Sequence, residues 1–524
     1  MNLPEECWEL IFESLHHLCH LESLSLVCTS FLAVSNSVRH TLSITPQTVP
    51  YLSVILHRFH NLKKIVIPQF HGDLDSILSQ ISRSRLDLQS LTLCNQRTFP
   101  ALGFRELGSR MKNLRELNCS ITSSLKDSDL IVIGNSFPSL EEIDISYPES
   151  GHSFYFRNMY LHSTSVSSFV TDSGILALSK KLRGLRKINL SVDGIGIPTS
   201  ESWFEESFQF ARGLRELDLS NSSISDQLLC LIAEAGLPLK KLLLSHCCCF
   251  TLVGISTLLS KYQSLLYLDL EGANFLTDDS LILLSYFLHD LTFINLSSCS
   301  KLTNSAFFAI LKNCPLLNDI EMKNTNLGVE EFSMEVVKNY RVKSLLLDGN
   351  YSLDDEFIKK VAYACPHLQV LGVSHCSGIT EEGIVEIMKN CFKLRNLDFS
   401  RCGGEIKNLD IDFSFARLEV LKAQGTGIDD ETLVVIGKGC YGLVHLDLEG
   451  CFYVTDRGVK ELVETCRALR EINLKWCSNV SIDIVAWMVF SRPSLRKIIP
   501  PSGFVPTENQ RSFFLNHGCL VCDG

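Results

Sequence analysis

Aliphatic residues recur along nearly the whole chain in the short pattern L-x-x-L-x-L. Alternating apolar positions predict a short strand with one buried face at each copy of this pattern. Most copies lie 24 to 29 residues apart, and one longer interval of 45 residues follows Leu140. The first leucine-like position stands at Leu62, Leu88, Leu114, Leu140, Leu185, Leu214, Leu239, Leu265, Leu291, Leu317, Val342, Leu368, Leu394, Leu418, Leu443, Leu469 and Leu495.

A helical pattern follows about ten residues after each strand, with apolar residues at three-to-four spacing, as in DDSLILLSYFL (278–288) and DRGVKELVETC (456–466). Asp or Glu opens many of these stretches, where negative charge suits a helix N-terminus. A period near 26 residues is typical of leucine-rich repeats. One repeat cannot bury its own apolar face, so we expect an α/β fold in which the repeats stack into a curved solenoid, with a parallel sheet inside and helices outside.

The pattern also divides the chain into parts. We expect a helical segment over 1–41, a solenoid of about 17 repeats over 42–500, and a cap or tail over 501–524 that contains Phe513, Phe514 and Leu515. The 45-residue interval predicts an insertion near 147–169 that is rich in Tyr and Phe. Aromatic side chains dominate binding hot spots, so this insertion is a candidate binding loop. A loop packed on the solenoid and a degenerate repeat are the alternatives.

Eleven of the 21 cysteines fall at two fixed positions of the repeat. A small apolar side chain with a weak donor suits such core positions, so we expect structural, reduced thiols. The run 247–249 and the pair Cys519 and Cys522 lack the second pair of ligands that a zinc site needs, and we expect no metal and no cofactor. The eleven are Cys247, Cys299, Cys376, Cys402, Cys451 and Cys477 after the strand, and Cys314, Cys365, Cys391, Cys440 and Cys466 before the next strand leucine; Asn350 takes the first position in its repeat.

The first forty residues follow a different pattern. Pro4 with Glu5 and Glu6 is a sound helix start. A second helical stripe is predicted by the spacings of 3, 4 and 3 residues between Leu21, Leu24, Cys28 and Phe31. A helical unit of this size is too small to be stable alone, so it needs the solenoid, a partner, or both.

Leu3-Pro4-Glu5-Glu6, then ELIFESL (9–15) and LSLVCTSF (24–31), resemble the F-box motif. Thr29 and Phe31 stand where the family often has Lys and Trp, and Phe31 keeps the aromatic bulk. The repeats resemble the cysteine-containing leucine-rich repeats that follow the F-box in F-box proteins. Together the two resemblances cover residues 3 to 500.

This resemblance implies a substrate-receptor subunit of an SCF-type ubiquitin ligase, without catalysis of its own. The F-box would dock on a Skp-family adaptor, which a cullin scaffold with a RING subunit holds, and the repeats would present a protein target for ubiquitination and degradation. The residues that the resemblance places at the adaptor are Leu3, Pro4, Leu10, Ile11, Phe12, Leu15, Leu24, Leu26, Val27, Cys28 and Phe31. Packing inside the F-box is the alternative for each apolar member, since an amphipathic helix shows the same stripe either way.

The concave sheet face is expected to hold the substrate, because the residues flanking the middle strand leucine point there. The first sixteen repeats place fourteen acidic residues at these positions (Glu116, Glu142, Asp144, Glu216, Asp218, Asp269, Glu271, Asp319, Glu321, Asp348, Asp398, Asp447, Glu449, Glu471) and six basic ones (Lys64, Lys187, Lys241, Lys323, Lys422, Lys475). This predicts a target with a basic segment, and a merely solvated surface is the alternative. The candidate substrate-binding residues are Asp218, Tyr267, Asp269, Phe293, Asp319, Glu321, Asp447 and Glu449, with Tyr155 and Phe156 in the insertion.

Composition narrows the remaining possibilities. The net charge of −11 argues against general nucleic-acid binding. The N-terminus has no signal-peptide pattern, and the uncharged stretch 242–260 falls in register with the repeats, so we expect a cytoplasmic or nuclear protein with no membrane partner. No phosphate-binding glycine loop, metal-binding His pair or GxSxG motif is present, which argues against an enzyme. A non-degradative F-box repeat protein, acting as a scaffold or small-ligand co-receptor, remains the alternative.

Overall fold

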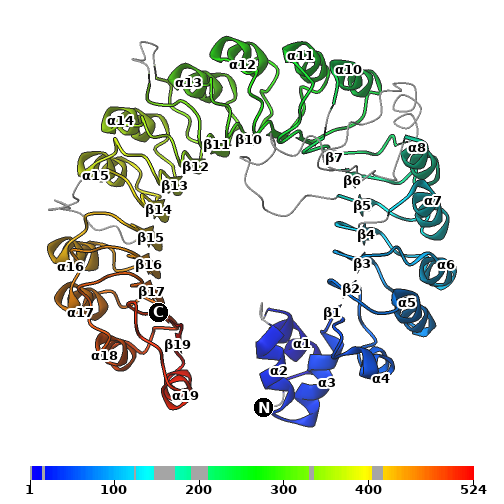
Figure 1. The fold of residues 1–524 in the computed structure, drawn as a ribbon, viewed down its shortest axis with the longest axis horizontal. Helices are drawn as coiled ribbons and strands as arrows, with labels where there is room; N and C mark the ends of the chain where they lie inside the picture. Colours follow the sequence, from blue (N-terminus) through cyan, green and yellow to red (C-terminus); the bar gives the residue numbers. More distant parts are fainter. Residues whose placement is uncertain are drawn as a thin grey trace. The chain divides into compact units, whose positions relative to one another are not determined.

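The computed structural model describes residues 3–14, 18–122, 125–146, 172–190, 211–222, 224–329, 336–403 and 417–523. The chain divides into two compact units, Met1–Tyr262 and Gln263–Gly524. Within each unit, short parallel strands line one side and helices line the other (Figure 1). Both units are leucine-rich-repeat solenoids, which confirms the predicted fold class.

The first unit begins with three helices, α1 (Glu5–Glu13), α2 (Leu18–Ser25) and α3 (Thr29–Ser37). Its strands are β1 (Thr41–Ser43), β2 (Lys64–Val66), β3 (Ser90–Thr92), β4 (Glu116–Asn118), β5 (Glu142–Asp144), β6 (Lys187–Asn189), β7 (Glu216–Asp218) and β8 (Lys241–Leu243). The helices of its repeats are η1 (Val49–Tyr51), α4 (Leu52–Arg58), α5 (Leu74–Arg83), α6 (Ala101–Arg110), α7 (Asp127–Ser136), α8 (Asp172–Lys181), α10 (Asp226–Glu234) and α11 (Leu252–Lys261).

The second unit continues the same alternation. Its strands are β9 (Tyr267–Asp269), β10 (Phe293–Asn295), β11 (Asp319–Glu321), β12 (Ser344–Leu346), β13 (Val370–Gly372), β14 (Asn396–Asp398), β15 (Val420–Lys422), β16 (His445–Asp447), β17 (Glu471–Asn473), β18 (Lys497–Ile499) and β19 (Leu520–Val521). Its helices are α12 (Asp278–Ser285), α13 (Asn304–Asn313), α14 (Asp355–Ala364), α15 (Glu381–Asn390), α16 (Asp430–Gly439), α17 (Asp456–Thr465), α18 (Ile484–Ser491) and α19 (Glu508–Asn516).

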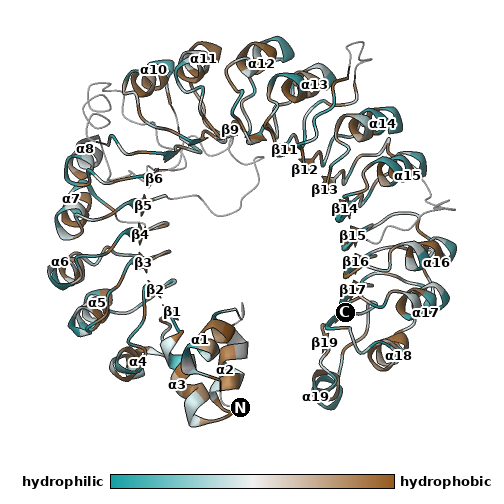
Figure 2. Cartoon of the chain, turned by 180° about the vertical axis from the view of Figure 1, so that it is seen from behind, coloured by the Kyte–Doolittle hydropathy of each residue, from teal (hydrophilic) through white to brown (hydrophobic). Residues whose placement is uncertain are grey.

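Neighbouring strands pair in parallel with equivalent repeat positions side by side. Ile294 of β10 lies opposite Ile320 of β11, and Leu371 of β13 lies opposite Leu397 of β14. The middle residue of each three-residue strand is buried. Figure 2 shows apolar and polar residues alternating on the helices of the repeats, as expected for helices with one buried face.

The helical N-terminal unit differs from the expected pattern at one place. Helix α1 begins at Glu5, directly after Pro4, as predicted. The predicted second stripe through residues 21–31 is wrong as a single helix, because the chain turns between α2 and α3. The Cys28 Sγ accepts the backbone N–H of Phe31 at 3.4 Å and so caps α3 in the place usually taken by Ser, Thr or Asp.

The C-terminal segment carries a further helix and strand. Helix α19 precedes β19, which pairs in parallel with β18 and extends the sheet. Phe514 is buried, whereas Phe513 and Leu515 are exposed. The uncharged stretch 242–260 contributes most of β8 and α11, and none of the described helices is both long and apolar enough to cross a bilayer.

Candidate protein-binding surfaces

The N-terminal helical unit closes around a small apolar core. Phe12 is 1% exposed and packs with the buried Leu21, Val34 and Val38. Phe31 lies against this core with its ring centroid 5.2 Å from that of Phe12, and Trp8 lies against both rings. These aromatic contacts join α1 to α3 and fix which faces of the helices remain outside.

Several large apolar side chains of this unit are left in solvent. Leu10 and Ile11 on α1 are 68% and 43% exposed, and Leu26 and Val27 in the turn between α2 and α3 are 88% and 64% exposed. Leu3, just before α1, is 46% exposed. So many exposed aliphatic residues within 25 positions are typical of a docking surface. We call these five residues the apolar face of the helical unit.

The structure separates the eleven candidate adaptor residues into groups. Phe12 points into the core, so for this residue the alternative of internal packing holds. Leu24 and Phe31 are partly buried against that core, Pro4 and Cys28 are exposed, and Leu15 lies outside the described residues. The remaining five form the apolar face.

Polar contacts attach the helical unit to the first repeat. Arg58 Nε of α4 donates to Asn36 Oδ1 at 3.0 Å, and Asn61 Nδ2 donates to the Ser37 carbonyl at 3.0 Å. His40 Nε2 lies 3.9 Å from Glu13 Oε1. These contacts orient α1–α3 against the start of the sheet.

The second candidate surface is the sheet face that the helices leave uncovered, which we call the open face. Several of its acidic residues have a structural task. Asp218, Asp269 and Asp447 each end a strand, and the Oδ1 atom of each accepts the backbone N–H two residues later at 3.0 to 3.1 Å. Asn295 and Asn473 make the same contact in their repeats. In these five repeats the Asp or Asn at the third strand position closes a local turn, whatever binds there.

Side chains of neighbouring repeats also contact each other on the open face. Asn295 Nδ2 donates to Glu271 Oε2 at 3.1 Å, and Asn473 Nδ2 donates to Glu449 Oε2 at 3.1 Å. Within a single repeat, Lys323 pairs with Glu321 at 3.0 Å. Much of the predicted acidic column is thus engaged within the sheet.

One part of the open face of the second unit combines aromatic rings with carboxylates. Tyr267 and Phe293 stack with their ring centroids 3.9 Å apart and an angle of 4° between the planes. Asp319 follows on the next strand, with Glu321 two residues further on. Burial raises the pKa of the Asp319 carboxyl, and the nearby Glu321 adds to this, whereas Lys343 opposes it. Tyr155 and Phe156, the candidates in the insertion, lie outside the described residues.

The cysteines after the strands bind backbone carbonyls of the preceding repeat. Cys402 Sγ donates to the Val373 carbonyl at 3.0 Å, and Cys477 Sγ donates to the Leu448 carbonyl at 3.1 Å. Asn350 performs this role with its amide, which donates to Met322 O at 2.8 Å. All eleven predicted cysteines are buried, so their structural assignment is confirmed. In the described residues no group of three or more His, Cys, Asp or Glu side chains is arranged to hold a metal ion.

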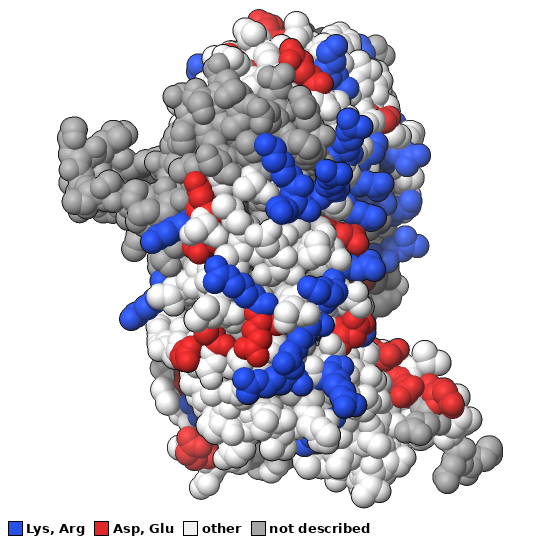
Figure 3. All heavy atoms as spheres, turned by 90° about the vertical axis from the view of Figure 1, so that its right-hand side faces the viewer, with Lys and Arg blue, Asp and Glu red and all other residues white. Residues whose placement is uncertain are grey.

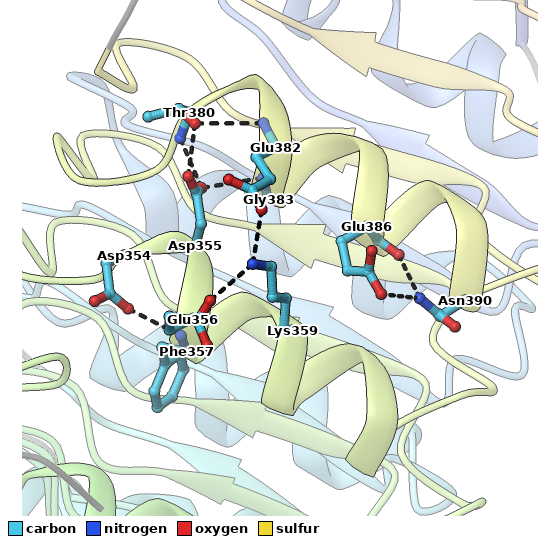
Figure 4. A network of polar contacts seen from close by, with 10 residues as sticks. All are labelled: Asp354, Asp355, Glu356, Phe357, Lys359, Thr380, Glu382, Gly383, Glu386 and Asn390. Carbon is cyan, nitrogen blue, oxygen red and sulfur yellow. Dashed lines mark hydrogen bonds and ion pairs between the residues drawn. The ribbon is translucent and has the colours of Figure 1, made fainter. Parts of the chain in front are cut away.

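Sequence reasoning missed a second connection between repeats, shown in Figure 4. Asp355 at the start of α14 accepts from the backbone N–H of Thr380 at 2.8 Å, from its hydroxyl at 2.6 Å, and from the Gly383 N–H at 3.1 Å. A Cβ at Gly383 would lie 2.4 Å from Asp355 Oδ1, so a larger residue there would displace this carboxylate from its contacts. Lys359 then bridges Glu356 and Glu382 across the two helices.

The signal for this connection was present in the sequence. Asp226 with Thr251 and Gly254, and Asp430 with Thr455 and Gly458, repeat the arrangement with a helix-opening Asp followed one repeat later by T-x-x-G. These aspartates join repeats in addition to suiting the helix N-terminus.

Comparison with known proteins gives partial matches. No model of a known protein family matches the chain. A 157-residue segment is 29% identical to F-box/LRR-repeat protein 4 of Bos taurus, covering 29% of this chain and 25% of that protein. A 62-residue segment is 29% identical to antagonist of mitotic exit network protein 1 of Saccharomyces cerevisiae, covering 12% of this chain and 11% of that protein. The chain therefore spans well under two thirds of the length of either relative.

Among solved structures, a chain of the yeast Rad7–Elc1 complex aligns with a TM-score of 0.42 and 16% identity, over 92% of this chain and 95% of that chain. The repeats, their register and the partial sequence match together establish a leucine-rich-repeat protein with similarity to an F-box/LRR-repeat protein.

Proposed function

We propose that this chain is the substrate-binding subunit of an SCF-type ubiquitin ligase. Its N-terminal unit, residues 1–41, would dock on a Skp-family adaptor, and through it on cullin and RING subunits. The observation that carries this proposal is the apolar face, which stays exposed although the helical unit has a closed core of its own. The F-box-like sequence of this unit and the partial match to an F-box/LRR-repeat protein support it.

In this proposal the chain is not a catalyst. The repeats hold a protein target, and the ligase gains rate because target lysines stay close to the ubiquitin thioester. The contacts with the adaptor come from Leu3, Leu10, Ile11, Leu26 and Val27, together with the exposed Pro4 and Cys28. Phe12 acts indirectly, by holding α1 against α3.

Adaptor binding is tested by co-purification of a Skp-family adaptor with the full chain and with two matched variants. Leu10→Asp places a charge on the apolar face, and we expect adaptor binding to weaken at least tenfold. Val253→Asp is the control, because Val253 is also an aliphatic residue on a helix, is 66% exposed, and lies on α11. Unchanged adaptor binding by Leu10→Asp, or equal loss in both variants, would contradict the proposal.

We propose the open face of the second unit as the substrate surface. The stacked rings of Tyr267 and Phe293 beside Asp319 and Glu321 offer cation–π and ion-pair contacts to a Lys or Arg side chain of the target. Asp269 and Asp447 contribute less, because each is 8% exposed and holds its own turn. Cross-linking of a bound target, followed by mass spectrometry, is expected to map a basic segment to β9–β11. An acidic target segment on this face would rule the idea out.

A further inference from the structure

A short arginine motif occurs twice in consecutive repeats of the first unit. Arg183-Gly-Leu-Arg186 lies between α8 and β6, and Arg212-Gly-Leu-Arg215 lies directly before β7. The leucine of each copy is buried at about the same depth, with Leu185 at 1% and Leu214 at 0% exposure. The two motifs are therefore fixed in the same register, and all four arginines are exposed. We call these four residues the arginine quartet.

The sheet places the two copies next to each other. Strands β6 and β7 pair in parallel, and the backbone N–H groups of Arg215 and Glu216 donate to the Arg186 carbonyl at 2.8 and 3.0 Å. Paired strands are about 4.8 Å apart, so the backbones of Arg186 and Arg215 are separated by about this distance. Like charges placed side by side on neighbouring strands destabilise a fold unless an opposite charge lies between them.

At the same position of other repeats, in both units, the chain supplies such a charge. Lys63 pairs with Asp87 at 2.6 Å, and Arg395 pairs with Glu419 at 2.6 Å. Glu141 lies 3.1 Å from Arg115 and 3.4 Å from Arg186, which is a member of the quartet.

The other three members of the quartet lack this compensation. The side chains of Arg183, Arg212 and Arg215 make no ion pair or hydrogen bond in the part of the chain that the structure describes. The adjacent carboxylates on the strands, Glu142 and Glu216, lie 3.9 and 3.7 Å from Lys187. Three guanidinium groups are therefore available to a ligand.

The surroundings of the quartet strengthen its positive field. Lys181, the last residue of α8, is exposed and precedes Arg183 by two positions. Figure 3 shows several Lys and Arg side chains gathered on one side of the molecule, with Asp and Glu side chains above and below them. This local excess is opposite in sign to the net charge of −11, so it attracts anionic segments that the rest of the protein repels.

We propose that the arginine quartet binds an acidic polypeptide segment of a partner protein, one that carries several carboxylates. Guanidinium groups bind carboxylates through paired, charge-assisted hydrogen bonds, and the three unpaired members of the quartet, with Arg186 beside them, suit a short run of Asp and Glu. A long nucleic-acid backbone fits less well, because the open face beside the quartet carries Glu142, Asp144, Glu216 and Asp218. This surface is separate from both surfaces of the proposed ligase function and does not depend on it.

The test uses fluorescence anisotropy with the full chain and a fluorescein-labelled ten-residue oligoglutamate peptide. We expect binding that weakens with salt, and no binding of the matching oligoglutamine peptide. Arg212→Glu with Arg215→Glu should weaken oligoglutamate binding at least tenfold. The matched control is Arg467→Glu with Arg470→Glu. Arg467-Ala-Leu-Arg470, before β17, has the same spacing of two exposed arginines around a buried leucine, and the charge change is identical. The control should change binding less than twofold.

Circular dichroism and thermal unfolding check that each variant is folded, and Arg212→Gln with Arg215→Gln serves if charge reversal disturbs the fold. Equal weakening in both double variants would overturn the proposal, since it would reflect overall charge alone. Equal binding of oligoglutamine would overturn it too. A ten-nucleotide oligothymidylate is tested at the same salt concentration. If it bound more tightly than oligoglutamate, and if Arg212→Glu with Arg215→Glu abolished this binding, the ligand would be a nucleic acid and the proposal would be overturned.

Discussion

The helical N-terminal unit and the repeats treat apolar side chains differently. In the repeats the leucines of the pattern are buried, as Leu217 and Leu345 show at 0% exposure, because each repeat is covered by the next. The helical unit buries four hydrophobic residues in its core but leaves Leu10 and Leu26 mostly exposed. The apolar residues at periodic positions thus build the core of the repeats, whereas the exposed apolar residues outside the repeat pattern are candidates for binding.

Polar residues of the repeats can be compared in the same way. Many of the acidic, Asn and Cys side chains of the repeats serve to connect one repeat to the next or to close a turn, as Asp355 and Cys402 do. The arginine quartet contains three charged groups without such a task. Two substitutions and a labelling experiment test this division.

Phe12→Ala should destabilise the helical unit by about 3–5 kcal/mol, since it removes a fully buried ring that contacts Trp8 and Phe31. Hydrogen exchange measured by mass spectrometry should show faster exchange in α1–α3 and unchanged exchange in the strands of the second unit. Leu10→Ala is the control and should leave exchange unaltered, because Leu10 is 68% exposed. If Phe12→Ala also loosened the second unit, the helical unit could not be treated as a separate element.

Asn350→Ala should destabilise the second unit by more than Cys376→Ala, by about 2–3 against about 1 kcal/mol. The Asn350 amide donates to the carbonyls of Met322 and Leu347, and its oxygen accepts from Thr325 at 2.9 Å, so alanine leaves several buried polar groups without partners. Cys376 Sγ donates to the Leu347 carbonyl at the longer distance of 3.5 Å.

Urea unfolding followed by hydrogen exchange in β11–β13 measures both effects. Asn350→Cys should recover part of the loss, because cysteine occupies this position in six other repeats. Equal destabilisation by the two alanine variants would show that packing, and not hydrogen bonding, selects the residue at this position.

Sequence periodicity was sufficient for much of the fold because the interactions that build a repeat are local. The strand leucines, their parallel register and the cysteine positions all follow from a 26-residue spacing. The break between α2 and α3 was missed because a cysteine, which is not a usual helix cap, caps α3 through Cys28 Sγ. The Asp355–Thr380–Gly383 connection was missed because its partners are 25 to 28 residues apart and only the stacking of repeats brings them together.

The candidate sites were harder to predict, because exposure depends on tertiary packing. The F-box-like pattern marked both Phe12 and Leu10, and only the structure separates the buried ring from the exposed leucine. Counting acids on the open face overstated the charge available to a partner, since Asp269 and Asp447 accept backbone hydrogen bonds in their own turns.

Thiol reactivity should also differ between the repeats and the exposed segments. Burial raises the pKa of Cys299 and Cys402 to about 12, so at pH 9 only about one such thiol in a thousand is ionised, and the thiolate is the reactive form. Cys28 and Cys248 are exposed. Iodoacetamide should therefore alkylate Cys28 and Cys248 in the native protein while Cys299 and Cys402 stay unmodified at both pH 7 and pH 9, as measured by peptide mass spectrometry.

Unfolding in urea should make all four of these thiols reactive, which controls for intrinsic differences between peptides. Rapid native labelling of Cys402 would mean that β14 and the turn after it open to solvent. The Cys402 contact with Val373 would then not keep this repeat closed. The difference between rigid repeats and exposed binding segments would not hold at that repeat.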